Sequence, residues 1–164
     1  MYKELYESLL AGMQGVVGRT AVGAVNCDGY IGECGICSLA GISASTLSMN
    51  GVTKLDRAFF GQATPALTEA WFNGVTTTGQ YPFWTCSALR IVHLDGLQSF
   101  HAETLRVQSS AMTDVYIGGK TCDQILAMSG FPGMTPSSNS KYATITFHGS
   151  DGTIHYNGSA WIKS

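Results

Sequence analysis

One phrase occurs twice in this chain and constrains its fold more than any other feature. The first copy covers Ile42–Asp56 and the second covers Phe100–Asp114. Aligned without a gap, they share an apolar residue, Ala, Thr-Leu, a second apolar residue and a final Asp. In both copies the apolar positions change phase after the Thr, as in a strand with a bulge or corner. The repetition predicts a mainly β, short-stranded domain with quasi-repeated strand units.

The composition agrees with short strands and tight turns. Of the 164 residues 20 are Gly, and only 12% are charged, about half of the usual share of roughly 25%. A surface so poor in charge indicates either burial in an assembly or simply a neutral β-rich exterior. The formal net charge is -2 and no basic cluster is present, so nucleic acid is not expected as a partner.

The sequence also argues against a membrane and a secretory route. No apolar run approaches the length of a transmembrane helix, and the acidic start does not fit a signal peptide. Synthesis in the cytoplasm is therefore expected. An odd number of cysteines favours reduced thiols; they are Cys27, Cys34, Cys37, Cys86 and Cys122. Cys34 and Cys37 form a C-x-x-C without a second pair of ligands, so no metal or other cofactor is expected.

Residues 1–20 are expected to form an amphipathic helix. Its apolar stripe recurs at steps of four and three and consists of Tyr2, Tyr6, Leu9, Met13 and Val16. Two heptads are too short for an autonomous coiled coil, so the stripe must dock on another surface. Packing within the chain is the simpler explanation. The sharper hypothesis is an anchor between subunits or onto a scaffold.

The remainder divides into a β-rich domain, residues 21–130, and a linker with a C-terminal β-meander, residues 131–164. Turns are predicted at Asn50-Gly51, Asn73-Gly74 and Asn157-Gly158, because Asn and Gly tolerate positive φ. One or two helical turns are expected after Thr64-Pro65, and a short helix near Thr121. In the meander, strands are expected over 142–148, 153–156 and 159–162.

No catalytic motif is present, and the chain is expected not to be an enzyme. The predicted final hairpin places His148 opposite His155, but such pairs are more often unliganded than metal-bound. Aromatic side chains are the remaining candidates for ligand binding, through stacking on sugars or protein contacts. The candidates are Trp71, Tyr81, Trp84, Tyr156 and Trp161. A place in the core is the simpler explanation for each of them.

Two segments resemble bacteriophage proteins. Ser43–Leu55 resembles shaft segments of bacteriophage tail fibres and related virion appendages, and Asp151–Trp161 is similar to hairpins that often close such proteins. The resemblance implies a β-rich, commonly trimeric structural protein of the virion whose N-terminus docks on other virion proteins. The size of the chain fits a head fibre, decoration protein or tail adaptor better than a long fibre.

The leading hypothesis is a non-enzymatic virion structural protein that forms a closed homo-oligomer, expected to be a trimer. Its tip would take part in host attachment, with a cell-surface glycan as the candidate receptor. A second hypothesis is a bactofilin-like β-solenoid polymer, which would assemble end to end. A small carbohydrate-binding module or sugar-acting enzyme ranks third, because it needs carboxylates that converge in an aromatic groove.

Overall fold

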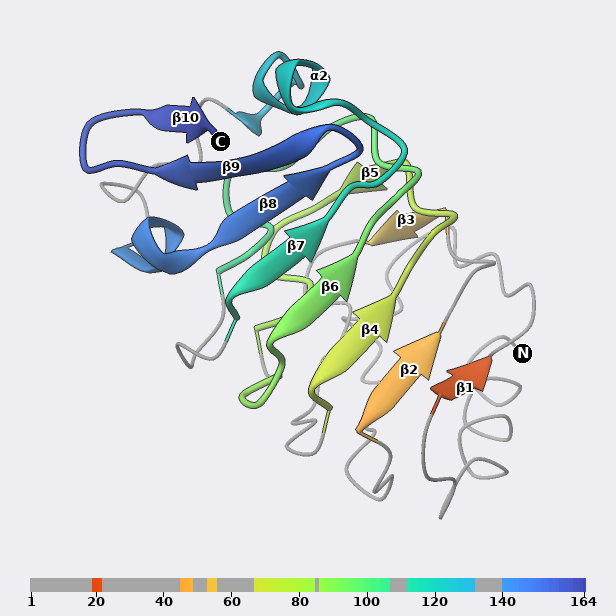
Figure 1. The fold of residues 1–164 in the computed structure, drawn as a ribbon. Helices are drawn as coiled ribbons and strands as arrows, with labels where there is room; N and C mark the ends of the chain where they lie inside the picture. Colours follow the sequence, from red (N-terminus) through yellow and green to blue (C-terminus); the bar gives the residue numbers. More distant parts are fainter. Residues whose placement is uncertain are drawn as a thin grey trace.

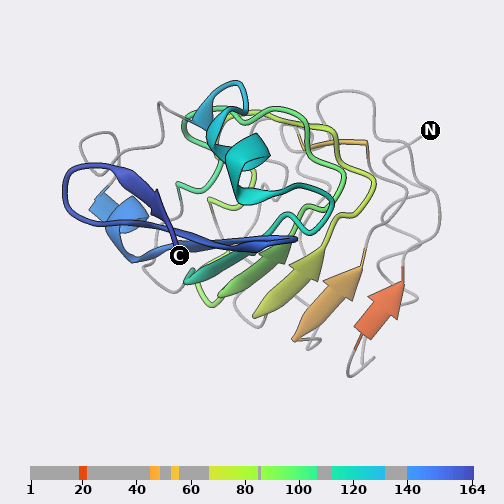
Figure 2. The same cartoon turned by 45° about the horizontal axis from the view of Figure 1, so that its top comes forward.

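A computed structural model describes residues 19–21, 45–48, 53–55, 67–84, 86–106, 112–131 and 140–164. The described part is mainly β, with short strands, few helices and one large mixed sheet. Figure 1 shows this sheet as a single twisted layer, and Figure 2 shows the coloured loops and helix α2 (Cys122–Leu126) on one side of it. The prediction of a mainly β fold is confirmed.

Six strands of the large sheet run parallel and follow one another in chain order. They are β1 (Arg19–Ala21), β2 (Thr46–Ser48), β4 (Glu69–Trp71), β6 (Ile91–His93), β7 (Asp114–Tyr116) and β8 (Thr146–Gly149). Across β2, β4, β6 and β7 the successive register partners lie 23, 22 and 23 residues apart. The chain thus returns to the sheet about once every 23 residues, as in a solenoid.

A second, narrow row of pairing lies on the return path of each coil. Strand β3 (Lys54–Leu55) pairs parallel with β5 (Thr77–Thr78), and isolated bridges continue the row through Ser99 to Ser129. Side chains repeat with the same period: the Thr68 and Thr76 hydroxyls each donate to a carbonyl 23 residues earlier. Successive coils are therefore stacked in register on both sides of the core.

The core lies between the two rows. Strands β4, β6 and β7 have three residues each, of which only the central one is buried. Alternation along a strand sends this side chain inward and its two neighbours outward. The central row comprises Leu47, Ala70, Val92, Val115, Phe147 and Ile154, each at most 3% exposed. The return segments supply the opposite wall with Leu55, Phe83, Leu97, Phe100 and Phe131.

The predicted C-terminal meander is present. Strand β8 pairs antiparallel with β9 (Gly152–Tyr156), which pairs antiparallel with β10 (Trp161–Lys163). Because β8 also pairs parallel with β7, the meander extends the sheet across the expected boundary at residue 131. The first strand begins later than predicted, because Ser140–Thr144 forms the 3-10 helix η2.

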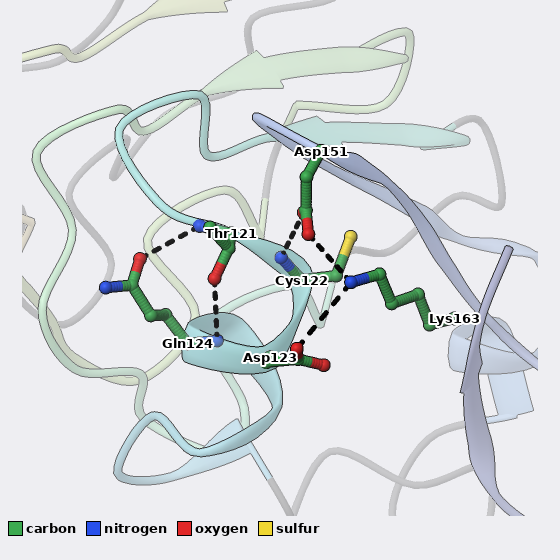
Figure 3. A network of polar contacts seen from close by, with 6 residues as sticks. All are labelled: Thr121, Cys122, Asp123, Gln124, Asp151 and Lys163. Carbon is green, nitrogen blue, oxygen red and sulfur yellow. Dashed lines mark hydrogen bonds and ion pairs between the residues drawn. The ribbon is translucent and has the colours of Figure 1, made fainter.

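Helix α2 (Cys122–Leu126) confirms the short helix predicted near Thr121. The Thr121 hydroxyl accepts a hydrogen bond from the Gln124 N–H, and the Gln124 side chain accepts one from the Thr121 N–H (Figure 3). This capping box satisfies two donors that a helix start leaves open. The local sequence is therefore sufficient to explain where α2 begins.

Two expectations need correction. Residues 69–71 form strand β4 instead of the helical turns expected after Thr64-Pro65, because parallel pairing on both sides overrides a weak helical pattern. The described parts of the repeated phrase also differ: Thr46–Ser48 is strand β2, whereas residues 102–105 form a turn. The spacing of 58 residues between the copies does not match the coil of 22 or 23. The predicted helix of residues 1–20 lies outside the described residues.

Candidate functional site

The outer face of the parallel sheet carries a continuous row of rings. In each strand the residue after the buried centre points outward, which places Trp71, His93, Tyr116 and His148 side by side in register on four neighbouring strands. We call these four residues the ring ladder. In Figure 1 the strands that carry it lie in front of the loops, and no other coloured element crosses this face of β4, β6 or β7.

The four rings are stacked face to face. Ring centroids are 4.7 Å apart for Trp71 and His93, 4.7 Å for His93 and Tyr116, and 4.2 Å for Tyr116 and His148. Interplanar angles are 6°, 15° and 10°. These distances match the spacing of about 4.8 Å between neighbouring strands. The sheet itself therefore sets the stack, and each pair adds about 0.5–1.5 kcal/mol beyond the area it buries.

Two carboxylates hold the imidazoles of the ladder in place. His93 Nε2 lies 2.8 Å from Glu69 Oε1, and His148 Nε2 lies 2.7 Å from Asp114 Oδ1. In both pairs the acid is the outward residue before the buried centre of the preceding strand. Partial burial acts to raise the pKa of Asp114, but hydrogen bonds from Thr113 and His148 outweigh it and hold this pKa below its ordinary value.

The stacking of the rings determines which groups of the outer face a ligand can contact. Both flat faces of His93 and of Tyr116 are covered by neighbouring rings, so a sugar cannot lie flat on either of them. The ladder instead presents ring edges, the Tyr116 hydroxyl and the paired carboxylates. Ring edges carry partial positive charge. Such a face suits a polar partner bound by hydrogen bonds better than an apolar one.

A second aromatic group lies in the loops away from the ladder, and we call it the Tyr81 cluster. Tyr81 and Trp84 meet edge to face at 5.6 Å, and the Arg106 guanidinium lies over both rings at 5.4 and 5.7 Å. Arg106 Nη1 also lies 3.0 Å from Glu103 Oε1. The hydrogen bond between Tyr81 and Glu103 raises the pKa of the phenol and lowers the pKa of the carboxyl.

Tyr81 has a φ of 54°, which places it in the left-handed region. This conformation is uncommon for a residue with a side chain. Its N–H donates to the Glu103 carbonyl oxygen at 3.3 Å, and its carbonyl accepts from the Trp84 N–H at 3.1 Å. The cluster is therefore tied to the next coil through both backbone and side chain.

The two remaining candidates, Tyr156 and Trp161, lie on β9 and β10. The two rings meet at 5.5 Å, and Trp161 also packs on Phe131 and Phe147, each at 5.3 Å. Trp161 is thus mainly a core residue of the C-terminal end. The five predicted ligand-binding residues occupy three separate places, and the predicted anchor residues Tyr2, Tyr6, Leu9, Met13 and Val16 lie outside the described part of the chain.

Four of the residues that build this face are not marked by any local sequence pattern. Only Trp71 of the ladder was a candidate, whereas His93, Tyr116 and the acids Glu69 and Asp114 were not connected with it. Reading the sequence in steps of 22 or 23 residues would have aligned them. The predicted facing of His148 and His155 is wrong, because His148 lies opposite Thr153 in the β8–β9 register.

A polar network at the C-terminal end is structural (Figure 3). Asp151 Oδ1 accepts a hydrogen bond from the Cys122 N–H at 2.7 Å, and its Oδ2 lies 2.7 Å from Lys163 Nζ. Lys163 and the Cys122 N–H lower the pKa of Asp151 to about 2, and burial raises the pKa of the Cys122 thiol. The network ties α2 to the turn before β9.

Among the described residues, no group of three or more potential metal ligands comes together. No helix within the same residues is long and apolar enough to cross a bilayer. In comparisons with known proteins, no family model, no curated protein and no solved structure matches this chain. The chemistry of the outer face is accordingly the basis for a functional proposal.

Proposed function

We propose that this protein is a non-enzymatic structural protein of a virion appendage that binds a cell-surface glycan through the outer face of its parallel sheet. One observation carries the proposal: a rigid row of rings and carboxylates, drawn from successive coils, lies on an accessible sheet face. Stacked coils of this kind commonly provide extended binding surfaces. The setting in a virion rests on the resemblance of Ser43–Leu55 and Asp151–Trp161 to phage appendages.

The polar groups of the face support binding of a hydroxyl-rich partner. Glu69 and Asp114 are 27% and 32% exposed, and each still has lone pairs beyond its bond to a histidine. The stacked rings hold these groups in fixed positions, which lowers the ordering cost of binding. The lowered pKa of Asp114 also makes this carboxylate a weaker general base, which favours recognition over catalysis.

The strand arrangement at the C-terminal end favours a closed assembly rather than a bactofilin-like polymer. End-to-end stacking of parallel coils needs a parallel edge at both ends of the sheet. Here the last two strands, β9 and β10, are antiparallel, and the order of the sheet ends at β10. The meander therefore resembles a capping unit. A filament that continued the parallel coil would have to begin at a different surface.

Binding to intact bacterial cells tests the recognition. Labelled protein would be titrated onto a panel of strains before and after periodate oxidation, which destroys vicinal diols of glycans. We expect a subset of strains to bind the protein, with binding lost after periodate and in the double variant Glu69→Gln/Asp114→Asn. Trp84→Ala, in the Tyr81 cluster, is the matched control and should bind normally. Binding that survives periodate and the double variant would contradict the proposal.

The virion setting is tested separately. Antibodies against this chain should label particles released from a culture of the source organism, and the chain should sediment with those particles. A chain found only among free proteins would contradict the setting while leaving glycan binding intact.

A further inference from the structure

The turn between β9 and β10 holds an Asn-Gly pair in an unusual hydrogen-bonding arrangement. Asn157 Oδ1 accepts three hydrogen bonds, from the Ser159 N–H at 3.0 Å, the Ser159 hydroxyl at 3.0 Å and the Ala160 N–H at 2.9 Å. All four residues from Asn157 to Ala160 are exposed. The function proposed above uses none of these contacts.

We propose that Asn157 is a site of spontaneous backbone cyclisation and deamidation. In this reaction the Gly158 amide nitrogen attacks Cγ of Asn157 and forms a C–N bond, while the amide proton passes to water. The Cγ–Nδ2 bond then breaks, and the side-chain nitrogen takes up a proton from water and leaves as ammonia. Water finally opens the cyclic imide at either carbonyl, which yields aspartate or isoaspartate. No oxidant or reductant is required.

The three donors favour the first step. Negative charge develops on Oδ1 as the nitrogen attacks Cγ, and donors already in place stabilise such an oxyanion. Two of the three donors are backbone N–H groups whose positions are fixed by the turn. The turn itself is closed by a hydrogen bond from the Asn157 N–H to the Ala160 carbonyl oxygen at 3.0 Å. The side chain of this asparagine therefore meets donors that are fixed before the reaction begins.

The nucleophile and the space around it are also suitable. Within the described residues, the Gly158 N–H has no hydrogen-bond partner, so attack breaks no existing bond. Gly158 has a φ of 102°, and apart from its two chain neighbours no atom of the described residues lies within 4 Å of the place where its Cβ would be. The backbone can therefore rotate into the cyclic imide without displacing a neighbour.

Asn73-Gly74 provides a control within the same molecule. Asn73 is also exposed, but its side-chain oxygen accepts no hydrogen bond from the described residues. Its backbone is packed against the next coil: a Cβ on Gly96 would lie 2.6 Å from the Asn73 carbonyl oxygen. Cyclisation there requires movement of two coils. The two sites share the Asn-Gly sequence and differ in structure.

The test follows both asparagines in the full-length protein. The folded protein would be incubated at mildly alkaline pH, and peptides containing Asn157 and Asn73 would be quantified over time by mass spectrometry. We expect Asn157 to deamidate faster by on the order of tenfold. In denaturant the two rates should become similar, because both sites then react as unfolded Asn-Gly.

A variant separates the effect of the donors from simple exposure. Ser159→Ala removes one donor and should slow deamidation of Asn157 about threefold, which corresponds to the loss of one ordinary hydrogen bond. The deamidation rate of Asn73 should not change. Equal rates at the two sites in the folded protein would overturn the proposal. An unchanged or faster rate at Asn157 in Ser159→Ala would overturn the role of the donors.

Discussion

Asp114 and His148 lie on neighbouring parallel strands, with Oδ1 of the acid 2.7 Å from Nε2 of the imidazole. Their positions are 34 residues apart in the chain, yet the β7–β8 register brings them together. The same relationship joins Glu69 to His93 two coils earlier. In each pair the acid precedes the buried central residue of its strand, and the histidine follows the buried central residue of the next strand. This pairing therefore occurs twice along the outer face.

The bond between these two residues makes stability depend on pH. The folded-state pKa of Asp114 is lowered, so its contribution is present above the unfolded pKa of about 4 and is lost as pH falls through the folded value. We expect His148→Phe, which keeps a ring in the stack, to lose stability near neutral pH and to differ little from the parent in strong acid. The difference in the free energy of unfolding between the two proteins is measured by urea unfolding across this pH range. A constant difference at all pH values would contradict the assignment.

The ring ladder should contribute measurably to stability at Tyr116, which has a ring on each side. Tyr116→Ala removes two stacked contacts, and we expect a loss of about 1–3 kcal/mol in the free energy of unfolding. Tyr116→Phe keeps the stack and serves as the control, with a change below about 0.5 kcal/mol. Equal effects of the two substitutions would show that the hydroxyl, and not the stack, matters.

The stability of the fold should depend on the hydroxyl group of Tyr142. This side chain is fully buried, and its hydroxyl donates to the Ala102 carbonyl oxygen at 2.5 Å. Tyr142→Phe leaves that carbonyl without its partner, and we expect a cost of about 1–3 kcal/mol. The control Tyr156→Phe, on the half-buried side of β9, should be nearly neutral. Urea unfolding of both variants checks the prediction, which a neutral Tyr142→Phe would contradict.

Gly130 is required by the close approach of two coils. It has a φ of 86°, and a Cβ at this position would overlap the backbone carbonyl of Phe100. Gly130→Ala is therefore expected to cost at least about 3 kcal/mol or to prevent folding. Gly158→Ala has a similar positive φ but open space, and should cost only about 1 kcal/mol. Thermal unfolding of both separates steric overlap from backbone strain, and equal shifts would contradict the overlap.

The N-terminal stripe should control assembly if it anchors subunits. We expect the parent chain to form a closed oligomer, and Leu9→Glu/Met13→Glu to weaken it, because the charges fall on the apolar side. Light scattering measures the solution mass of both. Lys3→Glu/Gln14→Glu, on the polar side, is the control. A parent chain that is monomeric would remove the basis for an anchor.

The local sequence determined several elements by itself. The capping box at Thr121 and Gln124, the meander with its Asn157-Gly158 turn and the mainly β character each depend on residues close together in the chain. Such features are readable because capping, turn geometry and alternation act over a few residues. The repeated phrase at 42–56 and 100–114, by contrast, suggested an equivalence that the described residues do not adopt.

Only the tertiary structure decided the coil and the outer face. Each parallel strand has about three residues, too few for a periodic pattern, and from β2 to β7 its partner lies 22 or 23 residues away. Register between distant strands depends on the packing of Ala70, Val92 and Val115 in one shared core. That packing places Trp71, His93 and Tyr116 in a single stack, although nothing in their neighbouring residues indicates that they meet.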